Sequence, residues 1–316
     1  HFALSVALII ATPAAQAPAP RPVLIDTDIG SDIDDAFALA LALASPELDI
    51  KAITTVGGQA EDRAWIVCRF LSHGGFKSIP VAYGRDPQPK SEIDWQIQYR
   101  RHPAPIFNRT QKPEKVSAVE LMYQKLKEQP GKVTIIALGP LTNVARLLEE
   151  HPDAKALIRR IVAMGGSVNV GYRGKAPPEP EWNIKSDIPA ARAVFAAGVL
   201  LTVVPLDATA TVRFEDKQRD RLFAARTLLT FQVQTLHELW DDQLLAPDPP
   251  ALHDPVTIAA AFDQRLLTMQ DMRLTIDDTG MTKVEARKPN AKVAVGCKST
   301  EVVSWFVDRV RTVGQQ

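Results

Sequence analysis

Short apolar runs alternate along the chain with longer stretches in which apolar residues recur every three or four positions. The first pattern predicts buried strands, and the second predicts amphipathic helices. The expected strands lie at residues 23–25, 49–56, 79–84, 133–138, 161–164, 200–206, 273–276 and 291–295. The expected helices lie at residues 36–43, 61–72, 116–129, 215–240 and 300–313, and others begin near residues 142, 187 and 254. This alternation of strand and helix predicts an α/β fold with a mostly parallel sheet.

No break in composition and no internal repeat divides the chain, so we expect one domain over residues 21–316. Two long polar segments that contain several prolines, residues 85–113 and 167–183, interrupt the regular alternation. Long segments without regular structure inside a compact domain are typical of functional loops or lids.

The chain begins with an apolar run, residues 2–11, that is too short to cross a bilayer. Small residues follow at Ala14, Ala15 and Ala17, and then Pro18 and Pro20. This is the pattern of a secretory signal peptide that lacks its charged start. We therefore expect a secreted or periplasmic protein in which residues 1–20 take no part in the fold.

Five aspartates crowd into the turn between the first strand and the first helix, at positions 26, 28, 32, 34 and 35. Carboxylates this close raise one another's pKa unless a positive charge lies among them. The helix N-terminus compensates only Asp34 and Asp35, by about 0.3–1 kcal/mol each. A hard divalent cation would compensate the whole set, and such cations choose oxygen ligands.

Three explanations of this acidic turn are open. Aspartates commonly cap helices, so the turn can be a solvated helix start. A calcium loop of the EF-hand type fits poorly, because Gly30 and Ser31 stand where an Asp or Asn and then a Gly are needed. The third explanation, which we favour, is a catalytic metal site at the carboxyl end of the first strand.

Polar residues after later strands are expected to converge on the same edge of the sheet. Glu181 and Asn183 follow the fifth strand, and His253 precedes Asp254 further on. The His–Asp pair offers a proton donor beside a metal ligand, although a helix cap next to a surface ring is the alternative. Glu181 and Asn183, taken alone, serve equally well as hydrogen-bonding loop residues.

The charge balance bears on the partners of the protein. Lys and Arg together number 37, as do Asp and Glu, so no basic field attracts nucleic acid. No basic run interleaved with aromatic residues is present either. We expect neither nucleic acid nor membrane among the partners.

Five short blocks in this order resemble the inosine-uridine preferring nucleoside hydrolases: residues 26–36, 138–143, 164–166, 181–183 and 253–255. The resemblance covers about residues 21–316. It implies an open, mostly parallel sheet with helices on both faces, a Ca²⁺ ion in the active site and a homodimer or homotetramer. The implied reaction is hydrolysis of the N-glycosidic bond of small-molecule ribonucleosides.

The resemblance also implies roles for single residues. The side chains of Asp28, Asp35 and Asp254 and the backbone carbonyl of Leu138 would ligate calcium. Asp28 would also take a proton from a water on the calcium, and His253 would protonate the departing base.

Other matched positions would bind the sugar and the base. Asp34 and Asn183 would hydrogen-bond ribose hydroxyls, Glu181 would hold the 5′ end, and Met164 would line the ribose pocket. Six side chains are candidates for stacking a base, with ordinary packing as the alternative for each: Trp95, Tyr99, His102, Tyr172, Trp182 and Trp240.

Two departures from the family pattern affect these expectations. The acidic motif is two residues longer than the common Asp-x-Asp-Pro-Gly-x-Asp-Asp, so Asp32 is the alternative to Asp34 in the ribose role. Gly58 stands where many members have an Asn that reaches the substrate. The nucleobase is therefore not predicted. A non-catalytic calcium-dependent nucleoside- or sugar-binding protein and a hydrolase of a related ribosyl compound are the alternative functions.

Overall fold

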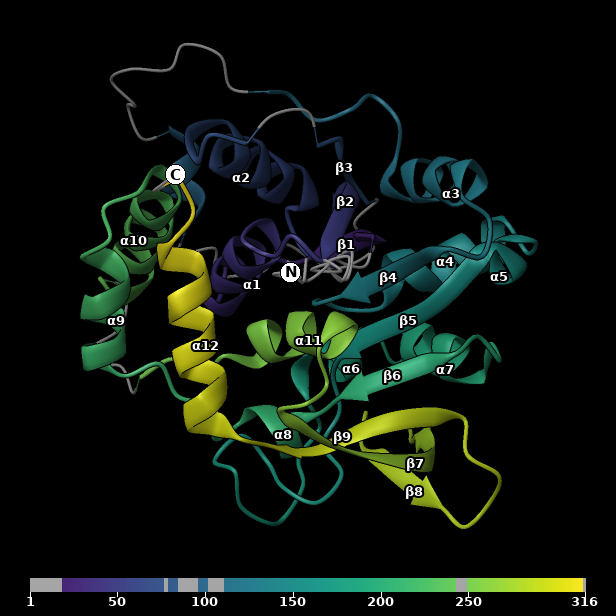
Figure 1. Cartoon of the computed structure of the whole chain (residues 1–316). Coiled ribbons are helices and arrows are strands. Elements are labelled where there is room, and N and C mark those ends of the chain that lie inside the picture. Colours follow the sequence, from purple (N-terminus) through teal and green to yellow (C-terminus); the bar gives the residue numbers. More distant parts are fainter. Residues whose placement is uncertain (1–18, 77–78, 85–95, 102–110, 243–248, 315–316) are drawn as a thin grey trace, which may run out of the picture.

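The computed structural model describes residues 19–76, 79–84, 96–101, 111–242 and 249–314. Most of the predicted signal segment and most of the predicted loop at residues 85–113 lie outside this described part. Within it, a single nine-stranded sheet has the strand order β3-β2-β1-β4-β5-β6-β9-β7-β8 (Figure 1). The strands are β1 (Arg21–Thr27), β2 (Leu48–Thr55), β3 (Val81–Tyr83), β4 (Val133–Ala137), β5 (Ile158–Met164), β6 (Leu201–Val204), β7 (Leu267–Ile276), β8 (Thr282–Glu285) and β9 (Ala291–Cys297).

The strand pairs from β3 through to β9 are parallel, and β7 is antiparallel to both of its neighbours, β9 and β8. Each of the eight expected strands has a counterpart, and the predicted mostly parallel α/β fold is confirmed. Strand β8 was not predicted, because its four residues, Thr282–Glu285, show no apolar run.

The helices are α1 (Asp34–Leu43), α2 (Ala60–His73), α3 (Ala118–Glu128), α4 (Thr142–Glu150), α5 (Ala154–Leu157), α6 (Trp182–Ser186), α7 (Ile188–Ala196), α8 (Leu206–Thr209), α9 (Asp216–Phe223), α10 (Leu228–Asp241), α11 (His253–Phe262) and α12 (Ser299–Arg311), with a short 3₁₀ helix η1 (Ile97–Arg101). The single helix expected over residues 215–240 is wrong. Two helices, α9 and α10, lie there instead. Arg226 between them has a positive φ of 49°, a backbone conformation that interrupts an α-helix.

Alternate residues of the strands point to opposite faces of the sheet and form two hydrophobic cores. Val23 and Ile25 of β1 pack with α1, α2, α10, α11 and α12 on one face. Leu24 between them packs with α3, α4 and α7 on the other. Both faces are covered by helices, as expected for parallel strands that are apolar throughout (Figure 1).

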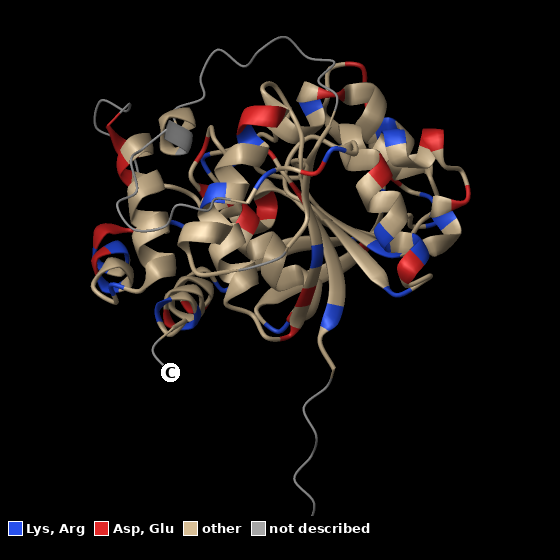
Figure 2. Cartoon of the chain, turned by 90° about the horizontal axis from the view of Figure 1, so that it is seen from above, with Lys and Arg blue, Asp and Glu red and all other residues tan. Residues whose placement is uncertain are grey.

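Helix α11 packs against α1, although the two helices start more than 200 residues apart in the chain. Both begin at the carboxyl-end edge of the sheet, where α1 follows β1 after a turn over residues 28–33. This packing brings the two N-termini together. Elsewhere Lys and Arg are interspersed with Asp and Glu over the helices (Figure 2). No helix in the described part of the chain is long and apolar enough to cross a membrane.

Candidate active site

Three buried carboxylates meet where α1 and α11 begin. Asp34 and Asp35 open α1, and Asp254 is the second residue of α11. One oxygen from each of the three lies within 4.8 Å of the others. Burial, followed by the charges of the neighbouring aspartates, raises the pKa of all three carboxyls. The structure thus brings together acidic residues from opposite ends of the chain.

Asp28 lies beside this cluster. Its charge is the largest effect after burial in raising the pKa of Asp35, and it contributes to the raised pKa values of Asp34 and Asp254 after other neighbours. A Cβ added to Gly139 would stand 2.6 Å from an Asp28 carboxylate oxygen, so only glycine fits there. Asp28 therefore reaches across to the loop that follows β4, next to Leu138.

Asp32 is not one of the three clustered carboxylates, although its charge is the largest effect after burial in raising the pKa of Asp34. It is exposed, and its carboxylate accepts a hydrogen bond from the backbone N–H of Ile33 at 2.7 Å. Of the two alternatives weighed for the longer turn, Asp34 is the one that lies in the acidic cluster.

Asn183 connects the ends of two neighbouring strands. Its side-chain Nδ2 donates to the carbonyl oxygen of Leu138 at 2.6 Å and lies 3.3 Å from the sulfur of Met164. Asn183, Leu138 and Met164 are all buried. The contact orients the Leu138 carbonyl, one of whose two lone pairs stays available to a ligand.

Glu181 precedes α6, and its carboxylate caps the first turn of that helix. Its two oxygens accept hydrogen bonds from the backbone N–H groups of Asn183 at 2.9 Å, Gly166 at 2.9 Å and Ile184 at 3.2 Å. Burial raises the pKa of Glu181 to about 7 in spite of these donors. Glu181 thus joins the loop after β5 to α6, and this bonding holds Asn183 in place.

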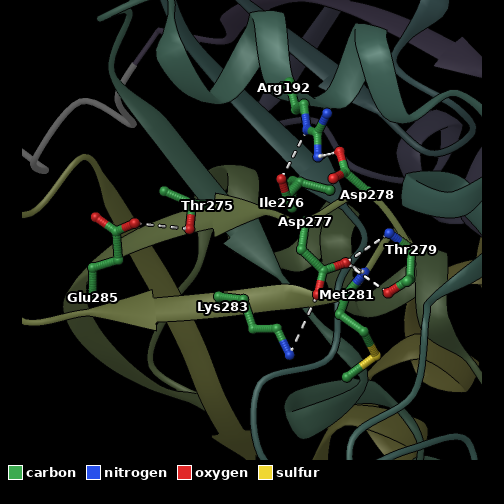
Figure 3. A network of polar contacts seen from close by, with 9 residues as sticks. All are labelled: Arg192, Thr275, Ile276, Asp277, Asp278, Thr279, Met281, Lys283 and Glu285. Atoms are coloured by element: carbon green, nitrogen blue, oxygen red, sulfur yellow. Dashed lines mark hydrogen bonds and ion pairs between the residues drawn. The ribbon is translucent and has the colours of Figure 1, made fainter.

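The turn between β7 and β8 lies behind this loop. Thr282 Oγ1 accepts a hydrogen bond from the backbone N–H of Ser167 at 3.4 Å, and a Cβ added to Gly280 would stand 3.1 Å from the Cα of Lys185 in α6. Figure 3 shows how the turn is held: Asp277 accepts bonds from Thr279 and Met281.

An arginine on α7 fixes the same turn from outside. Arg192 donates to the carbonyl of Ile276 at 2.8 Å and to Asp278 at 2.7 Å (Figure 3). The turn between β7 and β8 is thereby attached to the helix next to α6.

His253 stands directly before Asp254 at the start of α11. Its Nδ1 lies 2.7 Å from the hydroxyl of Thr209 at the end of α8. Burial, with a smaller contribution from the positive charge of Arg213, lowers the pKa of His253 to about 4. The imidazole is therefore neutral at neutral pH in the metal-free protein.

Two of the six aromatic candidates lie beside the residues of the site, Tyr172 against His253 and Trp182 next to Asn183 in the chain. The ring of Tyr172 contacts the ring of His253 edge-on, with centroids 6.4 Å apart, and its hydroxyl accepts from the backbone N–H of Trp182 at 2.7 Å. Trp182 itself is 56% exposed, with Lys185 near its ring.

Of the other four candidates, the structure describes two. Tyr99 and Trp240 are buried in the hydrophobic core, so packing, the alternative weighed for each, explains them. Trp95 and His102 lie outside the described residues.

The residues of the acidic cluster suit a hard metal ion. The donors are all oxygens, and Asp254 Oδ1 is buried without a hydrogen-bond partner among the described residues. A buried carboxylate oxygen left unpaired costs free energy that a cation would recover. The partial positive charge of two helix N-termini adds to the attraction for anionic side chains at this point.

Sequence reasoning missed two polar residues that support the site. Thr209 bonds His253 across the fold, and Arg63 of α2 lies buried under the acidic turn, where its guanidinium bonds the carbonyl of Ile29 at 3.0 Å. Arg63 shares the apolar stripe of its helix with Ala60 and Val67. The signal in the sequence was that Arg63 is a single charged residue among the apolar positions of this helix.

The comparisons with known proteins agree with this geometry. A family model described as inosine-uridine preferring nucleoside hydrolase matches residues 23–304. A pyrimidine-specific ribonucleoside hydrolase of Citrobacter koseri is 36% identical over 313 residues, which cover 92% of this chain and 97% of that protein. A relative of the same description from Escherichia coli is 34% identical over 314 residues, with 92% and 98% covered.

Solved structures give the same result for the fold. A plant nucleoside hydrolase superposes with a TM-score of 0.79 at 29% identity, covering 92% of this chain and 99% of that one. The inosine-uridine preferring nucleoside hydrolase of Bacillus anthracis superposes with a TM-score of 0.77 at 20% identity, covering 93% and 100%. The similarity to the Bacillus anthracis structure supports the fold alone.

Proposed function

The chain belongs to the inosine-uridine preferring nucleoside hydrolase family, and from this premise we propose that it is a calcium-dependent hydrolase that splits ribonucleosides into ribose and free base. Hydrolysis of the N-glycosidic bond follows from the family. The identity of the metal, the roles of single residues and the preferred base go beyond the family and are what we propose.

The observation that carries the proposal is the cluster of Asp34, Asp35 and Asp254, whose oxygens lie within 4.8 Å of one another. Asp28 and the Leu138 carbonyl lie beside it, and the donor set contains oxygen only. Calcium accepts six to eight oxygen ligands in flexible geometry, which suits carboxylates combined with a backbone carbonyl. We assign Asp28, Asp35, Asp254 and the Leu138 carbonyl as ligands. Calcium, when bound there, supplies a positive charge that orients the ribose diol and a water and lowers the pKa of that water.

Asp28 is the general base in this proposal. It lies beside the acidic cluster, with its carboxylate close to Gly139. In this position it accepts the proton of the attacking water. A carboxylate with several acidic neighbours binds a proton more readily than an isolated one, which favours the base role.

The sugar is held by Asp34, Asn183, Glu181 and Met164. The transition state of glycosidic cleavage carries positive charge on the ribosyl ring, so carboxylate and amide oxygens around it stabilise that charge. Asp34 and Asn183 bond the ribose hydroxyls, and Met164 lines the pocket beneath the ring. Glu181 faces the 5′ end; because its oxygens already accept three backbone N–H groups, its main contribution is to position Asn183.

His253 assists departure of the base. Its Nδ1 is anchored by Thr209, so Nε2 is the nitrogen left for the substrate. A ring whose pKa is lowered to about 4 is a weak base and, once protonated, a strong acid. An anionic leaving base beside the ring is what raises that pKa and makes the proton transfer favourable.

The named activity of the relatives suggests which substrates come first. The curated relatives from Citrobacter koseri and Escherichia coli are described as pyrimidine-specific, so we propose uridine and cytidine as the preferred nucleosides. Tyr172, in contact with His253, and the exposed Trp182 are the aromatic side chains that we assign to contact the base.

We also propose that the protein is exported to the periplasm or secreted, and that it forms a homodimer or homotetramer. Export is supported by the apolar run at residues 2–11 and the small residues after it. The oligomer is supported by the family resemblance. Light scattering on the purified protein and N-terminal sequencing of the exported form test the two proposals; a monomer or an uncleaved chain would contradict them.

The experiment that tests the function is a nucleoside panel with controlled calcium. Protein treated with a chelator is incubated with uridine, cytidine, inosine and adenosine, with and without added Ca²⁺, and free ribose is measured. We expect ribose release that depends on calcium and is lost in Asp35→Asn. Asp49→Asn, a half-exposed aspartate paired with Lys51 on β2, is the matched control and should behave like the wild type. Calcium-independent release, or tight nucleoside binding without any release, would contradict the proposal.

A further inference from the structure

The turn over residues 28–33 carries the acidic site but has little regular structure of its own. It is two residues longer than the motif common in the family, and the backbone carbonyls of its first two residues face α2. Buried carbonyl groups need hydrogen-bond donors, and the carbonyls of this turn receive them from other segments of the chain.

One guanidinium bonds two of them, the carbonyls of Asp28 and Ile29. Arg63 of α2 is only 3% exposed. Its Nη1 donates to the carbonyl of Asp28 and to the carbonyl of Ile29 at 3.0 Å, and it lies 3.3 Å from the hydroxyl of Ser31. Its Nε donates to the carbonyl of Gly58 at 2.8 Å, in the turn after β2. Arg63 thus joins two turns that follow neighbouring strands.

The backbone is shaped to admit this side chain. Gly30 has a positive φ of 126°, and a Cβ there would stand 3.3 Å from Arg63 Nη1 and 3.2 Å from Ile66. On the other side of the turn, Gln96 donates its side-chain Nε2 to the carbonyl of Asp32 at 2.9 Å, and its backbone N–H bonds the carbonyl of Gly30 at 3.0 Å. The turn is therefore held between two buried side chains, of which Arg63 contacts the segment next to Asp28.

We propose that Arg63 is a positioning residue that holds Asp28 and the rest of the long acidic turn in the conformation that binds the metal ion. The inference rests on the proposed function, because it concerns the same site. In this proposal Arg63 acts through the backbone of residues 28–31. The planar guanidinium matters, because its fixed N–H groups bond three or four acceptors at once, which a lysine ammonium on a flexible stem does not reproduce.

A second explanation makes the opposite prediction. Arg63 also places a positive charge near the acidic cluster and, after larger effects of burial, Asp28 and Thr27, helps to lower the pKa of Asp35. If Arg63 served only to balance charge, its removal would leave the acidic cluster more negative and bind calcium more tightly. If it positions the turn, its removal weakens calcium binding. The sign of the change separates the two explanations.

The test compares calcium affinity by calorimetry in the wild type, Arg63→Met and Arg63→Lys, each as the full chain after chelator treatment. Positioning predicts affinity reduced about 10- to 100-fold in Arg63→Met, the usual loss when a group that orients a ligand is removed. It also predicts a clear loss in Arg63→Lys, which keeps the charge. Unchanged affinity in Arg63→Lys together with tighter binding in Arg63→Met would overturn the proposal.

Two controls keep the outcome unambiguous. Arg69→Lys changes an arginine on the same helix that lies over the ring of Tyr99, and it should leave calcium affinity unchanged. Circular dichroism and melting without calcium report folding; a residue needed only for stability would lower the melting temperature and leave the affinity unchanged, which would also contradict positioning. If Arg63→Met does not fold, the calcium affinity of Arg63→Lys alone tests the proposal. Failure of the wild type to bind calcium would instead contradict the proposed function.

Discussion

Three carboxylates buried within 4.8 Å of one another are unfavourable without a cation, because each is both desolvated and repelled by its neighbours. Burial is the largest cause of the raised pKa at Asp34, Asp35 and Asp254. Such a cluster lowers the stability of the metal-free protein, and proteins commonly tolerate this loss where function requires it. At the residue scale, the site is therefore a set of anions arranged for a ligand.

His253→Ala tests the acid role. We expect uridine hydrolysis to fall about 10²- to 10⁴-fold, the usual contribution of a general acid, while an activated aryl riboside loses much less because its leaving group needs no proton. Steady-state rates on both substrates give the comparison. His151→Ala, on the far face where His151 stacks on Tyr123, serves as the control. An equal loss on both substrates would remove His253 from the acid role.

His237 makes a pH-dependent contribution to stability that is separate from the site. It packs among the rings of Phe37, Phe223 and Trp240, and burial lowers its pKa from 6.5 to about 4. A pKa lowered by folding means that its stabilising contribution is complete above pH 6.5 and is lost as the pH falls towards 4.

Urea unfolding of the wild type and His237→Leu at about pH 7.5 and about pH 5 measures that contribution. Between these pH values we expect the wild type to lose about 2 kcal/mol more than the variant, since only the wild type must bury a group that its unfolded chain protonates. The cavity effect of the substitution does not depend on pH and cancels in the comparison. If the wild type and His237→Leu lost the same free energy of unfolding between the two pH values, the pKa of His237 would not be lowered by folding.

At the element scale, hydrophobic periodicity predicted eight of the nine described strands and most of the long helices that cover the sheet. The helix break at Arg226 was missed because the residues on both sides, 215–223 and 228–240, have good helical patterns and no Gly or Pro separates them. Strand β8 was missed because its polar sequence is stabilised by pairing with β7 and by contacts to the loop after β5.

The residues of the site also divide into those that a local sequence pattern predicts and those that it does not. The aspartates of the first turn and the His253–Asp254 pair are local motifs, so sequence predicted them. Arg63 and Thr209 support the site only through contacts between distant segments, which no local pattern encodes.

The turn between β7 and β8 offers a test of how one element positions another. Arg192→Met removes the bonds that attach this turn to α7. We expect faster hydrogen exchange in β8 and in residues 165–167, and a several-fold loss in kcat/KM, with calcium affinity unchanged because no ligand moves. Arg265→Met, which breaks only an ion pair with Asp263 at the surface, is the control and should change none of these. Unaltered exchange and kinetics in Arg192→Met would contradict this role.

At the scale of the whole molecule, a single sheet brings the two ends of the chain to one site. Helix α1 follows the first strand, and α11 comes after six parallel-paired strands have been laid down. Their packing closes the acidic cluster, so formation of the site depends on completion of the fold. Calcium that binds only the folded chain must then stabilise the whole protein.

Calcium binding should also be linked to pH. Burial raises the pKa values of the three clustered carboxyls, so they bind protons more readily than exposed carboxyls do, and a cation must compete with those protons. We expect proton release on binding and affinity that increases as the pH rises from about 5.5 to 8. Calorimetry in two buffers of different ionisation enthalpy measures the released protons. Identical heats in both buffers and affinity independent of pH would contradict this competition between protons and calcium.

The most direct measurement is an electron density map of the protein crystallised with calcium and ribose. The account predicts one ion at about 2.3–2.6 Å from carboxylate oxygens of Asp28, Asp35 and Asp254 and from the carbonyl oxygen of Leu138, with the ribose diol on its open side. A map in which these side chains point apart, or in which calcium binds elsewhere while ribose occupies the site, would contradict it.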